Sequence, residues 1–287
     1  MSAQWRTARQ RKPTLVIGGT GKTGRRVAAQ LWDRGVPVRI GSRATEPPFD
    51  WQDPSTWEPA LQGVESAYIT YYPDLAVPGA TEAVAGLMRQ ALDCQVKRLV
   101  LLSGRGEERA QRAEQVLLNS DAEWTILRSS WFCQNFSESY LLDGVLHGKI
   151  ALPAGTVAEP FVDADDIAEV AVAALTEPGH VGQLYELTGP RLLTFGEAVE
   201  EIARASGRPV RYVSISAERY AALLAEQEVP DDVVALLMYL FTTVLDGRNA
   251  YLTDGVQRAL GRPARDFREY AWEVAATGIW DGSPTTV

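Results

Sequence analysis

The sequence of 287 residues contains few of the residue types that build metal centres and disulfide frameworks, with only two cysteines and two histidines. Cys94 and Cys133 lack the spacing of metal ligands, and His147 and His180 stand alone. Disulfide-stabilised secreted domains and zinc sites need more of these residues at regular spacings. The sequence therefore predicts a protein without a metal site, with reduced thiols and a cytoplasmic location.

Long hydrophobic runs and positive charge are also scarce. The longest apolar stretch, residues 233–245, is interrupted by Tyr239, Thr242 and Thr243. It is shorter than the roughly 18 residues of a membrane span, and it is typical of a buried helix. The formal net charge is −9, which disfavours binding to a phosphate backbone. We therefore expect a small-molecule substrate and neither a membrane nor a nucleic acid as partner.

Glycine, in contrast, is concentrated near the start of the chain. An apolar run at residues 14–17 is followed by a glycine turn and then by a helical pattern. Gly19, Gly21 and Gly24 have the G-x-G-x-x-G spacing of a dinucleotide-binding turn. In such a turn the glycines permit a tight bend, a close approach to a pyrophosphate and close packing of the helix on the strand. The predicted cofactor-binding residues of this segment are Gly18, Gly19, Thr20, Gly21, Lys22, Thr23 and Gly24.

A P-loop and a glycine turn without a ligand are the two alternative interpretations of this segment. The segment Gly21-Lys22-Thr23 resembles the end of a nucleoside-triphosphate P-loop, but that motif requires a glycine where this chain has Val16. An ATPase or GTPase is therefore disfavoured. A glycine turn that binds no ligand remains the simpler alternative.

Strand and helix patterns alternate through the first half, which indicates a parallel sheet covered on both faces. The expected strands are residues 14–17, 36–40, 64–70, 97–103 and 123–128, and the expected helices are residues 25–31, 81–92 and 107–118, with a short helix ending at 60–63. The fold class is therefore α/β, with a Rossmann-type doubly wound parallel sheet and a smaller, mainly helical substrate lobe.

The second half is more helical. A helix is expected at 166–175, a strand at 183–187, a helix from Thr194 to Ser206 ended by Gly207, a strand at 210–215, and mainly helices up to residue 277. Residues 13–175 are assigned to an NADP-binding domain, of which 131–160 contribute to the substrate cleft. Residues 176–287 are assigned to a smaller lobe interleaved with the first.

The end of the second strand suggests which dinucleotide binds. Folds that bind NAD place an acidic residue about 20 residues beyond the glycine turn to hold the ribose 2′-hydroxyl. Here the strand ends in Gly41-Ser42-Arg43, without a carboxylate. Ser42 and Arg43 offer hydrogen bonds and a planar guanidinium to a 2′-phosphate, and Lys22 could add a second positive charge. The sequence therefore favours NADP(H), with an exposed loop arginine as the alternative.

Several motifs make the chain resemble the NmrA-like branch of the atypical short-chain dehydrogenases/reductases. The matching segments are residues 18–24, 96–103, 124–128, 131–132, 135–136, 160–168 and 185–190, spread from about residue 14 to 215. Within that branch, residues 21–23 and 49–51 are most similar to the festuclavine (agroclavine) dehydrogenases of ergot alkaloid biosynthesis. The resemblance implies an NADP(H)-dependent reductase that acts on an iminium carbon.

One departure concerns the proton donor. Short-chain dehydrogenases that reduce ketones carry Tyr-x-x-x-Lys, and the resemblance puts the lysine near Arg112 and the tyrosine near Glu108. Without a general acid, carbonyl reduction would lose roughly 10²–10⁴-fold in rate. An iminium carbon is already cationic and needs no proton donor. The absence fits imine or conjugated-acceptor reduction, and it equally fits a protein that only senses NADP(H). Glu108 and Arg112 could simply form an exposed helical pair.

The remaining candidate site residues follow the expected strands. Ser103 ends the central strand, where ligands bind in open α/β sheets, and is predicted to have a catalytic and cofactor-binding role. Tyr71 is predicted to line the cofactor cleft, and Trp131, Phe132 and Asn135 are predicted to bind substrate. The alternatives are a plain strand-end serine, surface aromatics at Tyr71, and core packing of Trp131 and Phe132.

The acidic residues Asp163, Asp165 and Asp166 precede an expected helix. Hard cations favour carboxylates, but this position favours capping and dipole stabilisation over a metal site.

Two classes of function remain open. The first is an NADP(H)-dependent oxidoreductase of secondary metabolism that transfers hydride to a small aromatic or polycyclic metabolite, either an imine or iminium or a conjugated acceptor. The second is a non-catalytic NADP(H)-sensing regulator that binds a protein partner. A redox-neutral rearrangement on the same fold is a third possibility. The chain could also form a homo-oligomer.

Overall fold

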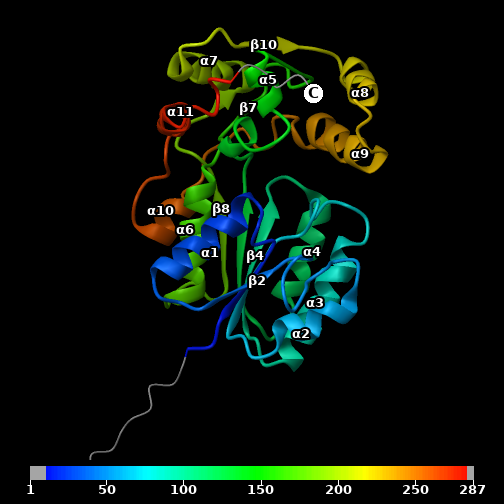
Figure 1. The fold of residues 1–287 in the computed structure, drawn as a ribbon, viewed down its shortest axis with the longest axis vertical. Helices are drawn as coiled ribbons and strands as arrows, with labels where there is room; N and C mark the ends of the chain where they lie inside the picture. Colours follow the sequence, from blue (N-terminus) through cyan, green and yellow to red (C-terminus); the bar gives the residue numbers. More distant parts are fainter. Residues whose placement is uncertain (1–10, 283–287) are drawn as a thin grey trace, which may run out of the picture.

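The computed structural model describes residues 11–282, in which six parallel strands form one twisted sheet (Figure 1). In spatial order the strands are β2 (Val38–Gly41), β1 (Thr14–Ile17), β3 (Ser66–Ile69), β4 (Arg98–Gly104), β5 (Glu123–Ser129) and β8 (Gln183–Leu187). The order reverses at β1 and β3, which is the switch point where doubly wound sheets bind their ligands. The predicted Rossmann-type α/β class is confirmed.

Two strands of the main sheet begin later than the sequence predicts, because turns occupy their first expected residues. Residues 36 and 37 are not part of β2: the Val36 N–H donates to the Leu31 carbonyl at the end of α1. In the same way the Val64 N–H donates to Leu61, so β3 begins two residues later. The hydrophobic pattern therefore indicates which residues are buried, but it does not indicate the residue at which the hydrogen bonds between strands begin.

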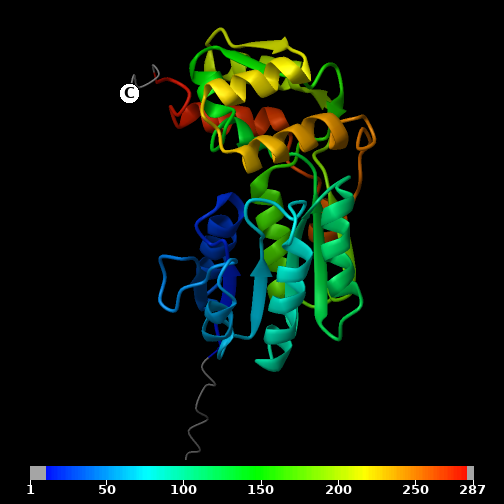
Figure 2. The same ribbon diagram turned by 90° about the vertical axis from the view of Figure 1, so that its right-hand side faces the viewer.

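Helices cover both faces of the sheet (Figures 1 and 2). One face carries α1 (Lys22–Asp33), α6 (Ala164–Thr176) and α10 (Gly255–Leu260), and the other carries α2 (Trp57–Leu61), α3 (Ala80–Asp93) and α4 (Glu108–Leu118), after a short 3₁₀ turn η1 (Pro54–Thr56). In β4, Leu99 and Leu101 pack into one core and Val100 into the other, and all three are fully buried. Residues 99–102 of this strand are all apolar because both of its faces are covered.

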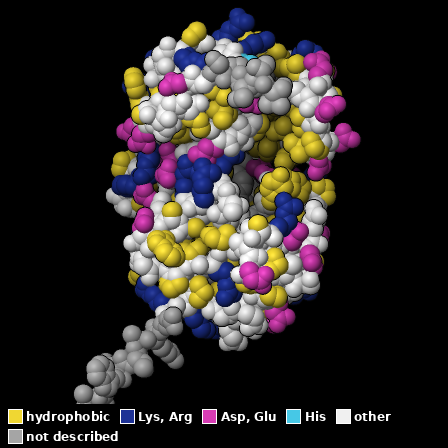
Figure 3. All heavy atoms as spheres, viewed as in Figure 1, with side chains coloured by type: hydrophobic (Ala, Val, Ile, Leu, Met, Phe, Trp, Pro, Cys, Tyr) yellow, Lys and Arg dark blue, Asp and Glu magenta, His cyan; other side chains and the backbone are white. Residues whose placement is uncertain are grey.

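A second group of elements lies beyond the carboxyl ends of the strands, and the surface is hollowed between the two halves (Figure 3). The group contains η2 (Cys133–Phe136), α5 (Leu142–Leu146), α7 (Phe195–Ser206), α8 (Ala217–Glu226), α9 (Asp231–Tyr239), η3 (Leu240–Val244), α11 (Phe267–Ala276), and the strand pairs β6 (Lys149–Leu152) with β10 (Arg211–Ser214) and β7 (Ala158–Glu159) with β9 (Leu193–Thr194). The strand expected at 210–215 thus pairs with β6, away from the main sheet.

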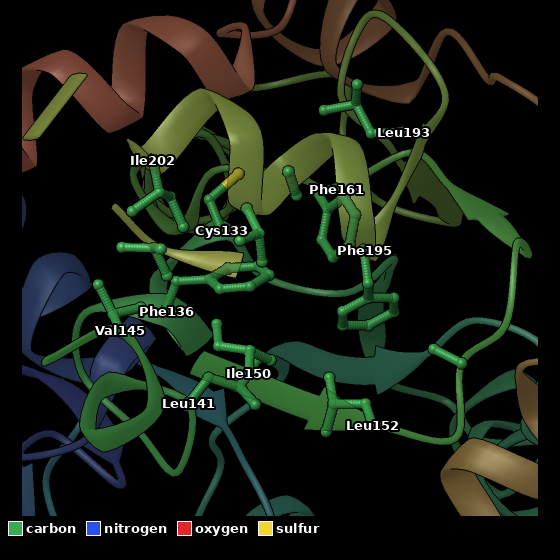
Figure 4. Packing of buried hydrophobic residues seen from close by; sticks show 14 of the residues in the cluster. Cys133, Phe136, Leu141, Val145, Ile150, Leu152, Phe161, Leu193, Phe195 and Ile202 are labelled. Atoms are coloured by element: carbon green, nitrogen blue, oxygen red, sulfur yellow. The ribbon is translucent and has the colours of Figure 1, made fainter. Parts of the chain in front are cut away.

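Aromatic side chains form the core of this second half (Figure 4). Phe161 packs edge-on against Phe195, with ring centroids 5.1 Å apart, and Phe136 packs edge-on against Phe267 at 5.6 Å. The indole N–H of the fully buried Trp280 donates to the Phe136 carbonyl at 3.1 Å. Segments before and after residue 176 therefore share one core, while β8 and α10 return to the sheet.

Local signals explain two helices of this half. Thr194 caps α7 and Gly207 ends the helix in the left-handed conformation at φ +67, as predicted. The structure adds a capping box between Thr194 and Glu197. The apolar stretch 233–245 is helical, but it was expected to be buried and Val233 and Leu236 are only partly covered. The reason is that these two side chains face a cavity. Within residues 11–282, no helix has the length and hydrophobicity to cross a membrane.

Candidate functional site

A cavity of about 530 Å³ lies between the two halves, at the carboxyl ends of β1, β3, β4 and β5. Its floor contains the glycine turn and the loops that follow the strands. Its roof is apolar and includes Leu236, Leu237 and Leu240. Hydrophobic side chains border this hollow at the surface (Figure 3). Ligand pockets of this size commonly combine an apolar lining with a few polar groups.

The glycine turn has the geometry that a pyrophosphate requires. Gly18 adopts φ +70, and the Gly21 N–H donates to its carbonyl at 2.8 Å. A Cβ atom on Gly24 would lie 2.1 Å from the Gly18 carbonyl oxygen, so only glycine allows α1 to pack this closely on β1. Gly21 is exposed, and its cavity side is open. The N-cap of α1 makes no side-chain capping bond and its first turn contains no acid, so the described residues leave these N–H groups to an anion.

Of the predicted residues of this turn, Gly18, Gly21, Lys22 and Thr23 line the cavity. Gly19 and Gly24 are buried beneath the turn, and Thr20 faces solvent.

The ammonium group of Lys22 does not lie at the end of β2, where it would reach a 2′-phosphate beside Arg43. It donates to Asn135 Oδ1 at 3.1 Å, so the positive charge is directed to the segment after β5 and not to the end of β2. Burial lowers the Lys22 pKa, although the nearby Glu138 carboxylate opposes this effect. Glu138 is itself paired with Arg26, with 2.7 Å between the guanidinium nitrogen and the carboxylate oxygen. This pair ties α1 to the second half.

Ser42 and Arg43 follow β2 outside the cavity lining. The Ser42 hydroxyl accepts a hydrogen bond from the Ala44 N–H, and Arg43 is exposed. Within residues 11–282, the Arg43 guanidinium makes no hydrogen bond or ion pair that would occupy its donors. It is therefore available to a phosphate at this edge of the sheet.

Ser103 lines the cavity but belongs to a buried polar chain. Its hydroxyl donates to Glu114 Oε1 at 2.6 Å, and Arg128 Nε donates to the same oxygen at 3.0 Å. Arg128 also bonds to Glu186 at 3.0 Å. The Ser103 hydroxyl proton is therefore used in the hydrogen bond to Glu114. The Ser103 oxygen can still accept a hydrogen bond from a ligand in the cavity. A serine held in this way positions a ligand rather than protonating it.

The predicted aromatic and amide side chains meet at the cavity wall. Tyr71, Trp131, Phe132 and Asn135 all line it. Tyr71 packs against Trp51, with ring centroids 4.7 Å apart. Trp131 also packs on Phe241, at 5.0 Å, so it contributes to the core on one side and to the cavity on the other. The two interpretations of Trp131 are therefore not exclusive.

Sequence reasoning missed three carboxyl groups that line the cavity: Asp74, Glu107 and Glu159. Glu107 and Glu159 are buried, and Glu107 Oε2 and Glu159 Oε1 have no hydrogen-bond partner among the described residues. Burial raises the pKa of Glu159 to about 7, although Ser130 and Arg105 oppose the shift. Burial, followed by the charge of Asp74, raises the pKa of Glu107 well above its usual range.

Two glycines allow the loop after β4 to take this shape. A Cβ atom on Gly104 would lie 1.9 Å from Glu107 Oε1, and one on Gly106 would lie 2.3 Å from Asn249 Nδ2. Asn249 donates to the Arg105 carbonyl at 3.1 Å, and Arg105 donates back to the Asn249 carbonyl at 2.9 Å. The loop is therefore fixed against a segment 144 residues away.

Other acidic and basic candidates lie outside the cavity lining. Glu108 and Arg112 are exposed on α4, and no ion pair joins them among the described residues. Asp163 caps α6 by accepting a hydrogen bond from the Asp165 N–H at 2.7 Å, so its predicted capping role is confirmed. Asp166 pairs with Arg262 at 2.7 Å. Over residues 11–282, no group of three or more potential ligands has the arrangement of a metal site.

Comparisons with known proteins agree with this geometry. A family model described as NAD(P)H-binding matches residues 18–178. An NAD(P)H azoreductase of Xenophilus azovorans is 31% identical, over 91% of this chain and 98% of its own length. An agroclavine dehydrogenase of Claviceps fusiformis is 29% identical, over 89% of this chain and 95% of its own.

Solved structures share the fold across most of the chain. An Escherichia coli NADPH-dependent quinone oxidoreductase complexed with NADPH is 22% identical, with a TM-score of 0.77 over 91% of this chain and 99% of that one. NmrA, a negative transcriptional regulator in complex with NAD, is 15% identical, with a TM-score of 0.71 over 93% and 97%. The fold is thus that of the dinucleotide-binding proteins.

The chain belongs to the NAD(P)H-binding family and is an NAD(P)H-dependent oxidoreductase. The resemblance to NmrA-like proteins and to the clavine dehydrogenases, which the motifs predict, is confirmed.

Proposed function

We propose that the protein is an NADPH-dependent reductase of small, flat, conjugated acceptors such as iminium ions, quinones or azo compounds. The observation that carries this proposal is the continuity of one cavity from the open glycine turn to the apolar roof. A dinucleotide on the turn and an acceptor under the roof would share this space. The relatives and neighbours described above are named an azoreductase, an agroclavine dehydrogenase and a quinone oxidoreductase, and azo compounds and quinones are acceptors of this class.

The described residues fit the phosphorylated cofactor. The free N–H groups of α1 suit the pyrophosphate, and the uncommitted Arg43 guanidinium with Ser42 suits the 2′-phosphate. Lys22 brings positive charge to the cavity beside Asn135. When bound, the cofactor supplies the hydride that reduces the acceptor.

The chain's own residues orient the reaction. Ser103 offers an acceptor oxygen at the end of β4, held by Glu114 and Arg128. Trp131 and Phe132 present flat apolar surface to the acceptor, and the leucines of the roof exclude water. These contacts favour a planar, weakly polar substrate over a sugar or a nucleotide.

Calorimetry and NADPH oxidation test the proposal together. We expect NADPH to bind more tightly than NADH, and we expect turnover with some members of a panel of cyclic iminium ions, quinones and azo dyes. Tight NADPH binding without turnover across the whole panel would favour the regulator instead. No binding of either cofactor by folded protein would refute the proposal.

A further inference from the structure

The three cavity carboxyls raise a question about the proton that accompanies the hydride. An iminium ion needs only the hydride, whereas an uncharged acceptor such as a quinone gains a hydride and a proton. The positions where the resemblance puts Tyr-x-x-x-Lys hold Glu108 and Arg112, which are exposed and do not line the cavity. A donor for uncharged acceptors must therefore come from another place in the chain.

Glu107 occupies an unusual position for an acidic residue at the start of a helix. It is the N-cap residue of α4, yet its side chain makes no capping bond to the free N–H groups of that helix. Its carboxyl group lies instead over the backbone of Gly104, the residue after Ser103. Glu107 is 7% exposed and lines the cavity next to a neighbouring acid, and its Oε2 has no hydrogen-bond partner among the described residues.

That neighbouring acid is Asp74, from the loop between β3 and α3. The two carboxyl groups are close enough to hydrogen-bond to each other, which requires that one of them carry a proton. The Ala76 N–H donates to Asp74 Oδ1 at 2.8 Å, which favours the ionised form of Asp74. Burial raises the pKa of Asp74, and the bonds from Glu107 and Ala76 oppose that shift, whereas the charge of Asp74 adds to the burial that raises the pKa of Glu107. We therefore assign the shared proton to Glu107, so that the pair holds one negative charge in total.

The other ionisable groups that face Glu107 do not release this proton. Glu114 approaches from α4 and raises the Glu107 pKa further by its charge. From α9, the side chain of Tyr239 lies near Glu107, and its own pKa is raised, so it stays neutral. Arg109 lies over the Tyr239 ring, with its guanidinium carbon 5.4 Å from the ring centroid. Burial and the charges of Asp74 and Glu114 thus favour the protonated form of Glu107.

We propose that Glu107 is the proton donor of this reductase for uncharged acceptors, and that Asp74 positions it by sharing its proton. This inference rests on the proposed function. For a quinone, a C–H bond of the reduced nicotinamide cofactor breaks and its hydride forms an O–H bond at one quinone oxygen, while the Glu107 O–H bond breaks and its proton forms an O–H bond at the other. The quinone is reduced to a hydroquinone and the cofactor is oxidised. Glu107 is left as a carboxylate, and a solvent proton restores the pair.

Glu107→Gln tests the donor with little change in charge. The amide imitates a protonated carboxyl group, can donate to the Asp74 carboxylate and leaves the pair with one negative charge, but it has no proton to transfer. Glu108→Gln is the matched control, because Glu108 is the next residue and is exposed. Thermal unfolding of both variants checks that they fold as the parent does.

Turnover is measured with a quinone and with an N-alkyl cyclic iminium ion. We expect Glu107→Gln to lower kcat with the quinone by about 10²–10⁴-fold, the usual contribution of a general acid. With the iminium ion we expect a change of less than about threefold, because no proton is needed, and the control should match the parent with both acceptors. Equal losses with both acceptors, or no loss with the quinone, would overturn the proposal. The quinone and the iminium ion are chosen from the acceptors that the parent reduces. Absence of parent turnover across the whole panel would refute the proposed function, and the donor role with it.

Infrared spectroscopy of the cofactor-free protein provides a readout independent of turnover. Because Glu159 is also partly protonated at neutral pH, we expect the protonated-carboxyl absorption to lose one component in Glu107→Gln and to be unchanged in Glu108→Gln. Asp74→Asn should retain a band but lower the pH at which it disappears, since the Asp74 charge helps to keep Glu107 protonated. The same variant should move the alkaline loss of quinone turnover to lower pH. A Glu107→Gln spectrum identical to that of the parent would show that Glu107 carries no proton.

Discussion

Glu159 provides a test of how strongly the cavity disfavours a buried charge. The side chain is fully buried, one carboxyl oxygen accepts from the Ser130 hydroxyl at 3.2 Å, and the other has no partner among the described residues. Burial raises its pKa from an ordinary value of 4.5 to about 7. The folded protein therefore binds this proton more tightly than the unfolded chain does.

The sign of the pH effect follows from this difference. Stability from the protonated group is fully present below pH 4.5 and is lost as the pH rises through about 7. A shift of this size corresponds to about 3 kcal/mol, since one pKa unit corresponds to about 1.4 kcal/mol. Glu159→Gln removes the titrating group. The variant should therefore gain about 3 kcal/mol in free energy of unfolding, relative to the parent, between pH 4.5 and pH 8.

Urea unfolding at several pH values between 4.5 and 8 measures this difference directly, because all other titrating groups are common to both proteins. Glu65→Gln, which removes an exposed carboxylate, should give a curve parallel to that of the parent. If the Glu159→Gln curve is also parallel to that of the parent, Glu159 is ionised in the folded protein at neutral pH. The reasoning from burial would then be wrong.

Two further substitutions separate cofactor binding from folding, and a third tests the choice of cofactor. Gly24→Ala places a methyl group 2.1 Å from the Gly18 carbonyl oxygen and should cost about 3 kcal/mol in urea unfolding. In Gly21→Ala the nearest atom is 3.2 Å away, so its stability should change by less than about 1 kcal/mol while calorimetry shows weaker NADPH binding. Arg43→Ala should weaken NADPH binding by roughly 10–100-fold, the loss of one charged hydrogen bond, and leave NADH binding unchanged. Equal losses for the two cofactors would place the 2′-phosphate away from Arg43.

The parts of the fold that local chemistry determines could be predicted from the sequence. Thr194, Glu197 and Gly207 set the ends of α7, and β8 occupies the expected residues 183–187. The glycine turn is equally local, because strand, turn and helix follow each other within a few residues. For the same reason its cofactor-binding role could be inferred before the rest of the site.

The acidic part of the cavity could not be predicted in this way. Asp74 and Glu107 follow neighbouring strands, so the topology brings them to the same edge of the sheet, but their distance in sequence hides the contact. Glu107 and Glu108 are adjacent and chemically equivalent, yet one is buried and the other exposed. Glu107 is buried because Gly104 leaves room for its carboxyl group and because Asn249 fixes the loop after β4. Both are tertiary contacts that the local sequence does not reveal. A signal was nevertheless present, since both acids follow the carboxyl ends of strands, where ligands bind.

The division of the cavity into a polar floor and an apolar roof accounts for how one fold can serve different acceptors. The floor comes from the glycine turn and the loops after the strands and contains the groups proposed for the pyrophosphate and for proton transfer, whereas Ser42 and Arg43 lie outside the cavity lining. The roof comes from α9 and the start of η3, and it contains none of the residues proposed for the cofactor. Changes in the roof can therefore alter the shape of the acceptor without altering the affinity for the cofactor. A shared proton on the floor extends the same site from cationic acceptors to uncharged ones, because the hydride chemistry is common to both and only the proton differs.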